Sequence, residues 1–132
     1  MTEPHMDWEQ LIKDGRDRGF LTKRLYAVNT VPTNGLGPVL AVLDEHAAYQ
    51  VKLEQEGVMW AAGPFANDAE DEWEGEGFFV YRAESKAEAI RYAEADPMHS
   101  SGARTFRVRT WLLNEGSFRV QVNYSTGRAE IL

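Results

Sequence analysis

Two residues that lie far apart in the sequence, His46 and Asp96, are of the types that form an acid–base pair. A carboxylate that accepts a hydrogen bond from one imidazole nitrogen fixes the tautomer of the ring and raises its basicity. The other ring nitrogen is then free to take a proton from a hydroxyl group or a carbon acid, and no nucleophilic side chain is needed. The residue types also allow a purely structural explanation, in which His46 is a satisfied buried histidine and Asp96 is a turn residue before Pro97. Both explanations stay open at this point.

The elements that must position this pair follow from the apolar pattern, which predicts four strands and two helices in the order βαββαβ. The expected strands cover residues 25–31, 58–62, 77–83 and 105–113, the expected helices cover residues 44–56 and 86–95, and residues 32–38 are an expected loop. This order is typical of the ferredoxin-like α+β fold, in which both helices cover one face of an antiparallel sheet. The start of the first helix and the end of the second then lie at the same end of the domain, so the topology places His46 within reach of Asp96.

Local signals mark the ends of the two expected helices. Asp44 is the expected N-cap of the first helix and Gly57 is its expected C-cap. Ser85 is followed three residues later by Glu88, which is a capping-box pattern at the start of the second helix. This helix is expected to end at Asp96, because the residue before a proline disfavours helical dihedral angles.

Three segments lie outside this core pattern. Residues 1–23 form an expected N-terminal arm with a short helical pattern at residues 7–14, and residues 114–132 form an expected C-terminal β-hairpin extension. The central domain is therefore expected to cover residues 24–113. The segment 68–76 is dominated by acidic residues, and this density of charge indicates a solvated loop rather than a core element.

The composition narrows the classes of function. The chain has 132 residues, which fits one globular domain, and its net charge of −7 repels phosphate backbones and anionic lipid surfaces. We therefore expect no nucleic-acid partner and no membrane partner. The absence of cysteine excludes thiolate nucleophiles and cysteine-based metal sites. The N-terminus has no signal-peptide pattern, so the expected location is the cytoplasm.

Seven further residues are candidates for contact with a substrate. Trp60 and Phe65 flank a Gly-Pro break and could line a pocket wall, although packing in the core is the favoured explanation for both. The complete set is Tyr49, Trp60, Gly63, Pro64, Phe65, Ser85 and His99. A metal set of His46, Asp96 and His99 is a further alternative, but its spacing matches no metal motif, so we expect no metal.

Two stretches of the sequence, LDEHAAYQVKLEQEGVMWAAGPF and SKAEAIRYAEADPMHSSGARTFRVR, resemble the YciI (YCII-related) family. The family pattern reads H-x-x-Y-x-x-x-L-x-x-x-G, followed by G-P and later by D-P near the end of the second helix. The resemblance covers residues 24–113, and the matching residues stand in the same order: His46, Tyr49, Leu53, Gly57, Gly63, Pro64, Asp96 and Pro97.

The resemblance implies a dimeric α+β barrel, related in fold to muconolactone isomerases, with His46 and Asp96 as catalytic residues in a pocket beside the sheet. One branch of the family dehydrochlorinates a chlorinated hydroxyhydroquinone. The expected function is therefore that of a lyase, isomerase or dehydrochlorinase that needs no cofactor and acts on a small cyclic or aromatic-derived metabolite. The alternative is a non-catalytic binding or accessory protein that uses the same pocket.

The expected assembly is a homodimer. A sheet with helices on one face must bury its other face, and a second copy of the chain can supply the cover. Val28, Phe79 and Val108 are the apolar side chains expected on that second face. The C-terminal hairpin is a further candidate for contact with the partner.

Overall fold

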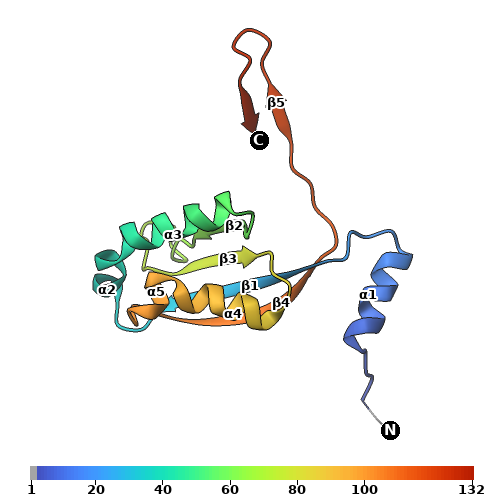
Figure 1. Cartoon of the computed structure of the whole chain (residues 1–132), viewed down its shortest axis with the longest axis horizontal. Coiled ribbons are helices and arrows are strands. Elements are labelled where there is room, and N and C mark those ends of the chain that lie inside the picture. The colour runs from blue at the N-terminus through green and yellow to red at the C-terminus, as the bar shows by residue number, and fades with distance from the viewer. Residues whose placement is uncertain (1–2) are drawn as a thin grey trace. The chain divides into compact units, whose positions relative to one another are not determined.

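The computed structural model describes residues 3–132 and shows an α+β protein (Figure 1). The chain divides into two compact units: Arg24–Trp111, and the segment that ends at Lys23 together with Leu112–Leu132. The elements are, in order, α1 (Trp8–Asp17), β1 (Lys23–Pro32), α2 (Leu36–Ala41), α3 (Leu43–Gln55), β2 (Met59–Pro64), β3 (Gly77–Tyr81), α4 (Lys86–Ala95), α5 (Pro97–Ser100), β4 (Arg104–Leu113), β5 (Val120–Val122) and β6 (Ala129–Ile131).

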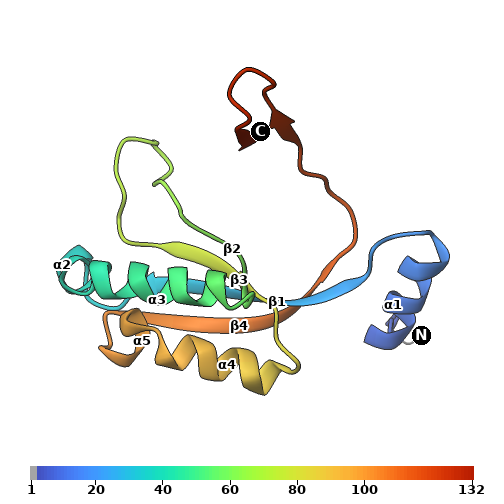
Figure 2. The ribbon, with the colours of Figure 1, turned by 45° about the horizontal axis from the view of Figure 1, so that its top comes forward.

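The main sheet has the strand order β2-β3-β1-β4. The central strand β3 pairs antiparallel with both β1 and β2. This is the ferredoxin-like order predicted from the sequence, with the strands of each β-α-β unit separated by one strand between them. The helices α3 and α4 run along the sheet, and α5 continues from the end of α4 (Figure 2).

The main core lies between one face of this sheet and the two long helices. Val28 on β1 is paired with Phe79 on β3, and both are buried against Leu53 of α3 and Ala93 of α4. Val108 of β4 belongs to the same cluster. The prediction that Val28, Phe79 and Val108 form the second, outward face of the sheet is therefore wrong, because side chains alternate between faces and these three point toward the helices.

Two short helices, α2 and α5, form in segments for which the sequence predicted no helix. The expected loop at 32–38 contains the start of α2, in which Pro38 occupies the first turn, where a missing N–H breaks no helical hydrogen bond. The helix α3 begins at Leu43 after Val42, so Asp44 lies in its first turn and is not its N-cap. Gly57 follows this helix with a φ of +78°, a conformation that glycine adopts without strain.

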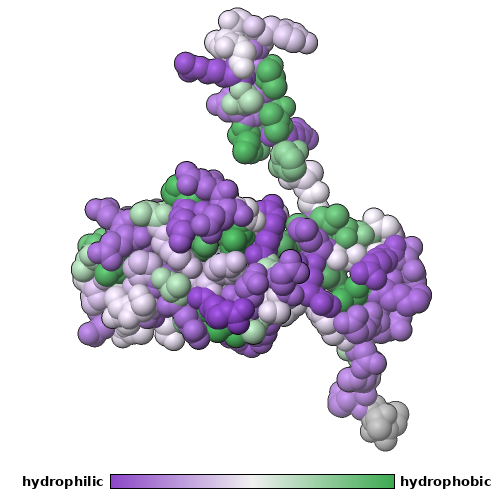
Figure 3. All heavy atoms as spheres, in the orientation of Figure 1, coloured by the Kyte–Doolittle hydropathy of each residue, from purple (hydrophilic) through white to green (hydrophobic). Residues whose placement is uncertain are grey.

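The second unit contains α1 and the small hairpin of β5 and β6. Gly15 is the closely packed point of α1, because a Cβ atom there would lie 2.7 Å from Cγ2 of Thr22. The hairpin strands pair antiparallel, with Val120 opposite Ile131. Apolar side chains gather on the hairpin surface (Figure 3), where Phe118 and Ile131 are largely exposed. Within residues 3–132, no helix is long and apolar enough to span a membrane.

Candidate functional site

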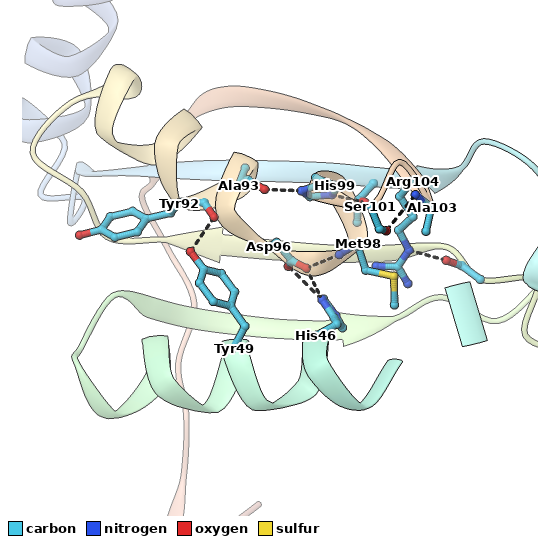
Figure 4. Close-up of polar contacts among 12 residues, drawn as sticks. His46, Tyr49, Tyr92, Ala93, Asp96, Met98, His99, Ser101, Ala103 and Arg104 are labelled. Atoms are coloured by element: carbon cyan, nitrogen blue, oxygen red, sulfur yellow. Dashed lines mark hydrogen bonds and ion pairs between the residues drawn. The ribbon is translucent and has the colours of Figure 1, made fainter. Parts of the chain in front are cut away.

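The structure brings His46 and Asp96 into direct contact (Figure 4). Nδ1 of His46 lies 2.7 Å from Oδ1 and 2.9 Å from Oδ2 of Asp96. Both residues are enclosed, with His46 7% exposed and Asp96 0% exposed. A carboxylate can only accept hydrogen bonds, so Nδ1 carries the proton and donates it to Asp96.

Asp96 is fixed by the junction between two helices. Pro97 is the first residue of α5, and Asp96 precedes it in an extended conformation, with φ −65° and ψ 129°. Its Oδ1 atom accepts a hydrogen bond of 2.9 Å from the backbone N–H of Met98, which caps α5. The short helix therefore holds the carboxylate in place against the first turn of α3, which carries His46.

A pocket of about 400 Å³ opens beside the histidine. Its walls come from α3, β2, β3, β4 and the acidic loop, and they are mostly apolar. The lining residues are Leu43, His46, Ala47, Gln50, Ala62, Gly63, Pro64, Trp73, Gly77, Phe79 and Arg104. Since Nδ1 of His46 is bound to Asp96, the other ring nitrogen, Nε2, is the one that can meet a molecule in this pocket.

Only part of the predicted substrate-contacting set lines this pocket. Gly63 and Pro64 do so, at the end of β2. Trp60 borders a separate groove between α3 and β2, and Phe65 borders a depression formed with the acidic loop. Ser85 lies at the opposite end of α4 from Asp96, where its side chain accepts a hydrogen bond from Glu88 N and caps the helix as predicted.

Tyr49 packs against α4 instead of the pocket. Its hydroxyl group donates a hydrogen bond of 2.7 Å to the backbone oxygen of Tyr92. Burial, with a smaller contribution from the negative charge of Asp96, raises the pKa of Tyr49 to about 12. The phenol therefore stays neutral and acts as a bridge between α3 and α4.

His99 has both ring nitrogens engaged within the protein. Nδ1 lies 2.6 Å from the backbone oxygen of Ala93, and Nε2 lies 2.8 Å from Oγ1 of Thr30. A carbonyl oxygen only accepts, so Nδ1 is the donor and Nε2 accepts from the threonine hydroxyl. Its ring packs on Phe106 with a centroid distance of 4.3 Å. Burial lowers the pKa of His99, so it is a neutral, partly buried histidine, and it does not line the pocket.

Three polar or aromatic pocket residues escaped the sequence analysis: Gln50, Trp73 and Arg104. Gln50 lies one helical turn after His46, a spacing that puts both on one face of α3. Arg104 shares the alternation of Phe106 and Val108 on β4, which predicts an inward side chain. The sequence thus contained a signal for these two residues, whereas the position of Trp73 depends on the path of the acidic loop.

Metal coordination finds no support in the geometry around His46. Residues 3–132 contain no cluster of three or more histidine, aspartate, glutamate or cysteine side chains placed to hold a metal ion. The nitrogens of His99 are committed to Ala93 and Thr30, so it does not complete the alternative set with His46 and Asp96.

The comparisons with known proteins agree with this fold. The 5-chloro-2-hydroxyhydroquinone dehydrochlorinase of Burkholderia phenoliruptrix AC1100, solved in complex with 2,5-dihydroxybenzoquinone, is similar with a TM-score of 0.52 and 22% sequence identity. The similarity covers 66% of this chain and 92% of that protein, and at this identity it concerns the fold. No curated protein sequence matches the chain.

The model of the YCII-related domain matches residues 25–112, a span that includes the pocket and both members of the His46–Asp96 pair. The chain therefore belongs to the YCII-related domain family.

Proposed function

We propose that the protein is a small enzyme in which His46 is the general base and Asp96 is its orienting partner. The observation that carries this proposal is the hydrogen bond from Nδ1 of His46 to the buried carboxylate of Asp96 beside the pocket. The carboxylate holds the tautomer that leaves a lone pair on Nε2. It also stabilises the positive charge that the ring gains when it takes a proton.

The proposed reaction is a proton abstraction followed by an elimination or a proton return. Nε2 of His46 takes a proton from a C–H or O–H group of the substrate, and the electron pair of that bond stays on the substrate. In a lyase or dehydrochlorinase this pair expels a leaving group such as chloride, whereas in an isomerase His46 returns the proton to a different atom. General-base catalysis of this kind contributes about 10²- to 10⁴-fold to a rate.

The pocket supports a small ring-shaped substrate. Its volume of about 400 Å³ lies at the lower end of the range for small-molecule sites. Phe79 and Trp73 give it aromatic walls, and Pro64 gives it a rigid rim. The structural neighbour acts on a chlorinated, hydroxylated ring, which supports hydroxylated cyclic or aromatic-derived metabolites as the substrate class.

The test is a turnover screen with wild-type protein and a His46→Gln variant. The compounds are chlorinated and unchlorinated hydroxyhydroquinones and small lactones, followed by absorbance and by chloride release. We expect turnover in the wild type and a loss of about 10²-fold or more in the variant. A His5→Gln variant is the matched control, because His5 is exposed and its ring contacts the exposed side chain of Asp7.

Turnover that survives in His46→Gln would contradict the assignment of the base. A compound that binds stoichiometrically but is recovered unchanged after long incubation would favour the alternative of a non-catalytic binding protein. A cytoplasmic location remains a prediction that fractionation of cells would check.

We also propose that the protein works as a homodimer through the sheet face opposite α3 and α4. Trp60 of β2 and Trp111 of β4 are 39% and 38% exposed, and the alternation along β4 puts Trp111 on the face opposite Val108, which packs in the core with the helices. Their rings meet at a centroid distance of 6.0 Å, and together they present an apolar surface that a second copy can bury. Sedimentation at micromolar concentration should give a dimer, and a Trp111→Glu variant should shift it toward monomer. A wild-type monomer would contradict the proposal.

The hairpin of β5 and β6 offers a second surface for such a partner. A two-stranded hairpin is at best marginally stable alone in water. Phe118 is 79% exposed and Ile131 is 78% exposed, so contact with another copy would bury substantial apolar area. Deletion of residues 114–132 should weaken the dimer if this contact forms.

A further inference from the structure

Arg104 places a buried positive charge in the wall of the pocket. It stands at the start of β4, and only 4% of its surface is exposed. A guanidinium group has five N–H donors. In the described part of the chain, this one makes a single hydrogen bond, of 2.8 Å, from Nε to the backbone oxygen of Gly75. Its Nη1 atom is enclosed and has no hydrogen-bond partner among residues 3–132.

Burial of a guanidinium group without a counter-ion lowers the stability of the folded protein. Buried charges in proteins are normally paired, because an unpaired one loses its hydration without compensation. No carboxylate within residues 3–132 forms an ion pair with Arg104, although the acidic loop runs past it. Asp96 acts on it electrostatically, but the carboxylate of Asp96 is committed to His46 and to the cap of α5.

The surroundings of Arg104 keep the guanidinium in place. Trp73 of the acidic loop flanks it, with the guanidinium carbon 5.9 Å from the ring centroid. Gly77 leaves room on another side, because a Cβ atom there would lie 3.3 Å from Nη1. The indole N–H of Trp73 donates to the backbone oxygen of Glu76. Aromatic contact and backbone contact thus hold the cation, while most of its donors stay unused.

We propose that Arg104 is the specificity-determining residue of this pocket, and that it binds a carboxylate group of the ligand. This inference rests on the proposed function and names its substrate class as small cyclic or aromatic carboxylates. Arginine donors match the two oxygens of a carboxylate in a paired arrangement. Gln50, which lines the same pocket, adds an amide that can hydrogen-bond another polar group of the ligand.

The charge balance of the site also favours an anionic ligand. With neutral His46, the charges of Arg104 and Asp96 cancel. A bound carboxylate adds one negative charge to the pocket, close to the imidazole ring that becomes positive when it takes a proton from the substrate, and the substrate gains the matching negative charge in that step. An anionic ligand therefore stabilises the imidazolium form that general-base catalysis produces.

The test compares benzoate with benzamide, two molecules of nearly equal shape that differ in charge. Calorimetric titration of the full-length wild-type protein should show benzoate binding at least about tenfold tighter than benzamide. An Arg104→Met variant should lose this preference, and Arg104→Lys should keep part of it. Arg107→Met is the matched control, because Arg107 is exposed on the other face of the same strand.

A second readout locates the ligand and does not depend on the variants folding. In NMR spectra of the wild type, benzoate should shift the imidazole signals of His46 and leave those of the exposed His5 unchanged. Equal binding of benzoate and benzamide, no benzoate binding at millimolar concentration, or an unaltered preference in a folded Arg104→Met protein would each overturn the inference.

The outcome separates this inference from the proposed function. Benzoate binding is measured without turnover, so a charge-selective pocket with no His46-dependent chemistry would support Arg104 as the anchor and contradict only the enzyme. Turnover of neutral substrates that is unchanged in Arg104→Met would support the enzyme and contradict Arg104 as the anchor.

Discussion

Replacement of Asp96 by asparagine should switch the tautomer of His46. In the native protein, Oδ1 of Asp96 accepts from Met98 N at 2.9 Å and also lies 2.7 Å from Nδ1 of His46, while Oδ2 lies 2.9 Å from the same nitrogen. In the Asp96→Asn variant, the capping bond to Met98 should hold the amide oxygen at the Oδ1 position, which places the amide NH₂ group next to Nδ1. An amide N–H pointing at Nδ1 opposes a proton on that nitrogen, so we expect the tautomer with its proton on Nε2 to replace the native one, even though the amide oxygen at the Oδ1 position stays close to Nδ1. His46 then presents an N–H instead of a lone pair to the pocket.

The contacts of Asp96 indicate how much its replacement should change the free energy of unfolding and the turnover. A hydrogen bond to a charged group is replaced by one between neutral groups, so unfolding should become easier by only about 1–2 kcal/mol. Full loss of the partner in Asp96→Ala should cost more, about 3–5 kcal/mol, since a buried pair is broken and the cap of α5 is lost. The catalytic loss in Asp96→Asn should be far larger than its stability loss suggests, about 10²- to 10⁴-fold, because the base has the wrong tautomer.

The assay combines long-range ¹H–¹⁵N NMR of the imidazole, which distinguishes the two tautomers, with urea unfolding and turnover. Asp68→Asn is the control for the change of charge, because Asp68 is exposed on the acidic loop. The reasoning is refuted if His46 keeps its proton on Nδ1 in Asp96→Asn, or if turnover persists while the tautomer has switched.

Three further predictions concern residues outside the pair. Burial lowers the pKa of His99 from its ordinary value of 6.5, so the unfolded chain binds a proton below that pH before the folded protein does. Stability should therefore fall as the pH drops below about 6.5, and this slope should be smaller in His99→Asn when unfolding is followed across that range. Burial raises the pKa of Tyr49 to about 12, above its ordinary value of 10, so the unfolded chain releases this proton first. Stability should fall as the pH rises from 10 through 12, and Tyr49→Phe should reduce that loss, to which Tyr81 also contributes because burial raises its pKa. The variant should also cost about 0.5–1.5 kcal/mol at neutral pH, because the hydrogen bond to Tyr92 disappears. Ser85→Ala should lower thermal stability by about 1 kcal/mol through loss of the α4 cap and should leave turnover unchanged, whereas a large loss of turnover would place Ser85 in the site.

The sequence alone determined the order of the four main strands and the two long helices, and the identity of the central pair. Strands and helices were predictable because their apolar periods depend on neighbours within a few residues. Local chemistry also set the helix ends at Ser85 and at Asp96-Pro97, since a cap bonds to the backbone two or three positions away. The βαββαβ order then constrained the topology, which brings His46 and Asp96 to the same end of the sheet.

Only the tertiary structure decided which side chains meet at the pocket. His99 is held by Thr30 and Ala93, and Arg104 is held by Gly75 of the acidic loop, through contacts between segments that no local pattern connects. The face of each strand is likewise set by the register and by what packs on it, which is why Val28 was assigned to the wrong side. A one-residue change in the assignment of a strand exchanges its two faces, so burial and the choice of pocket residues had to come from the folded chain.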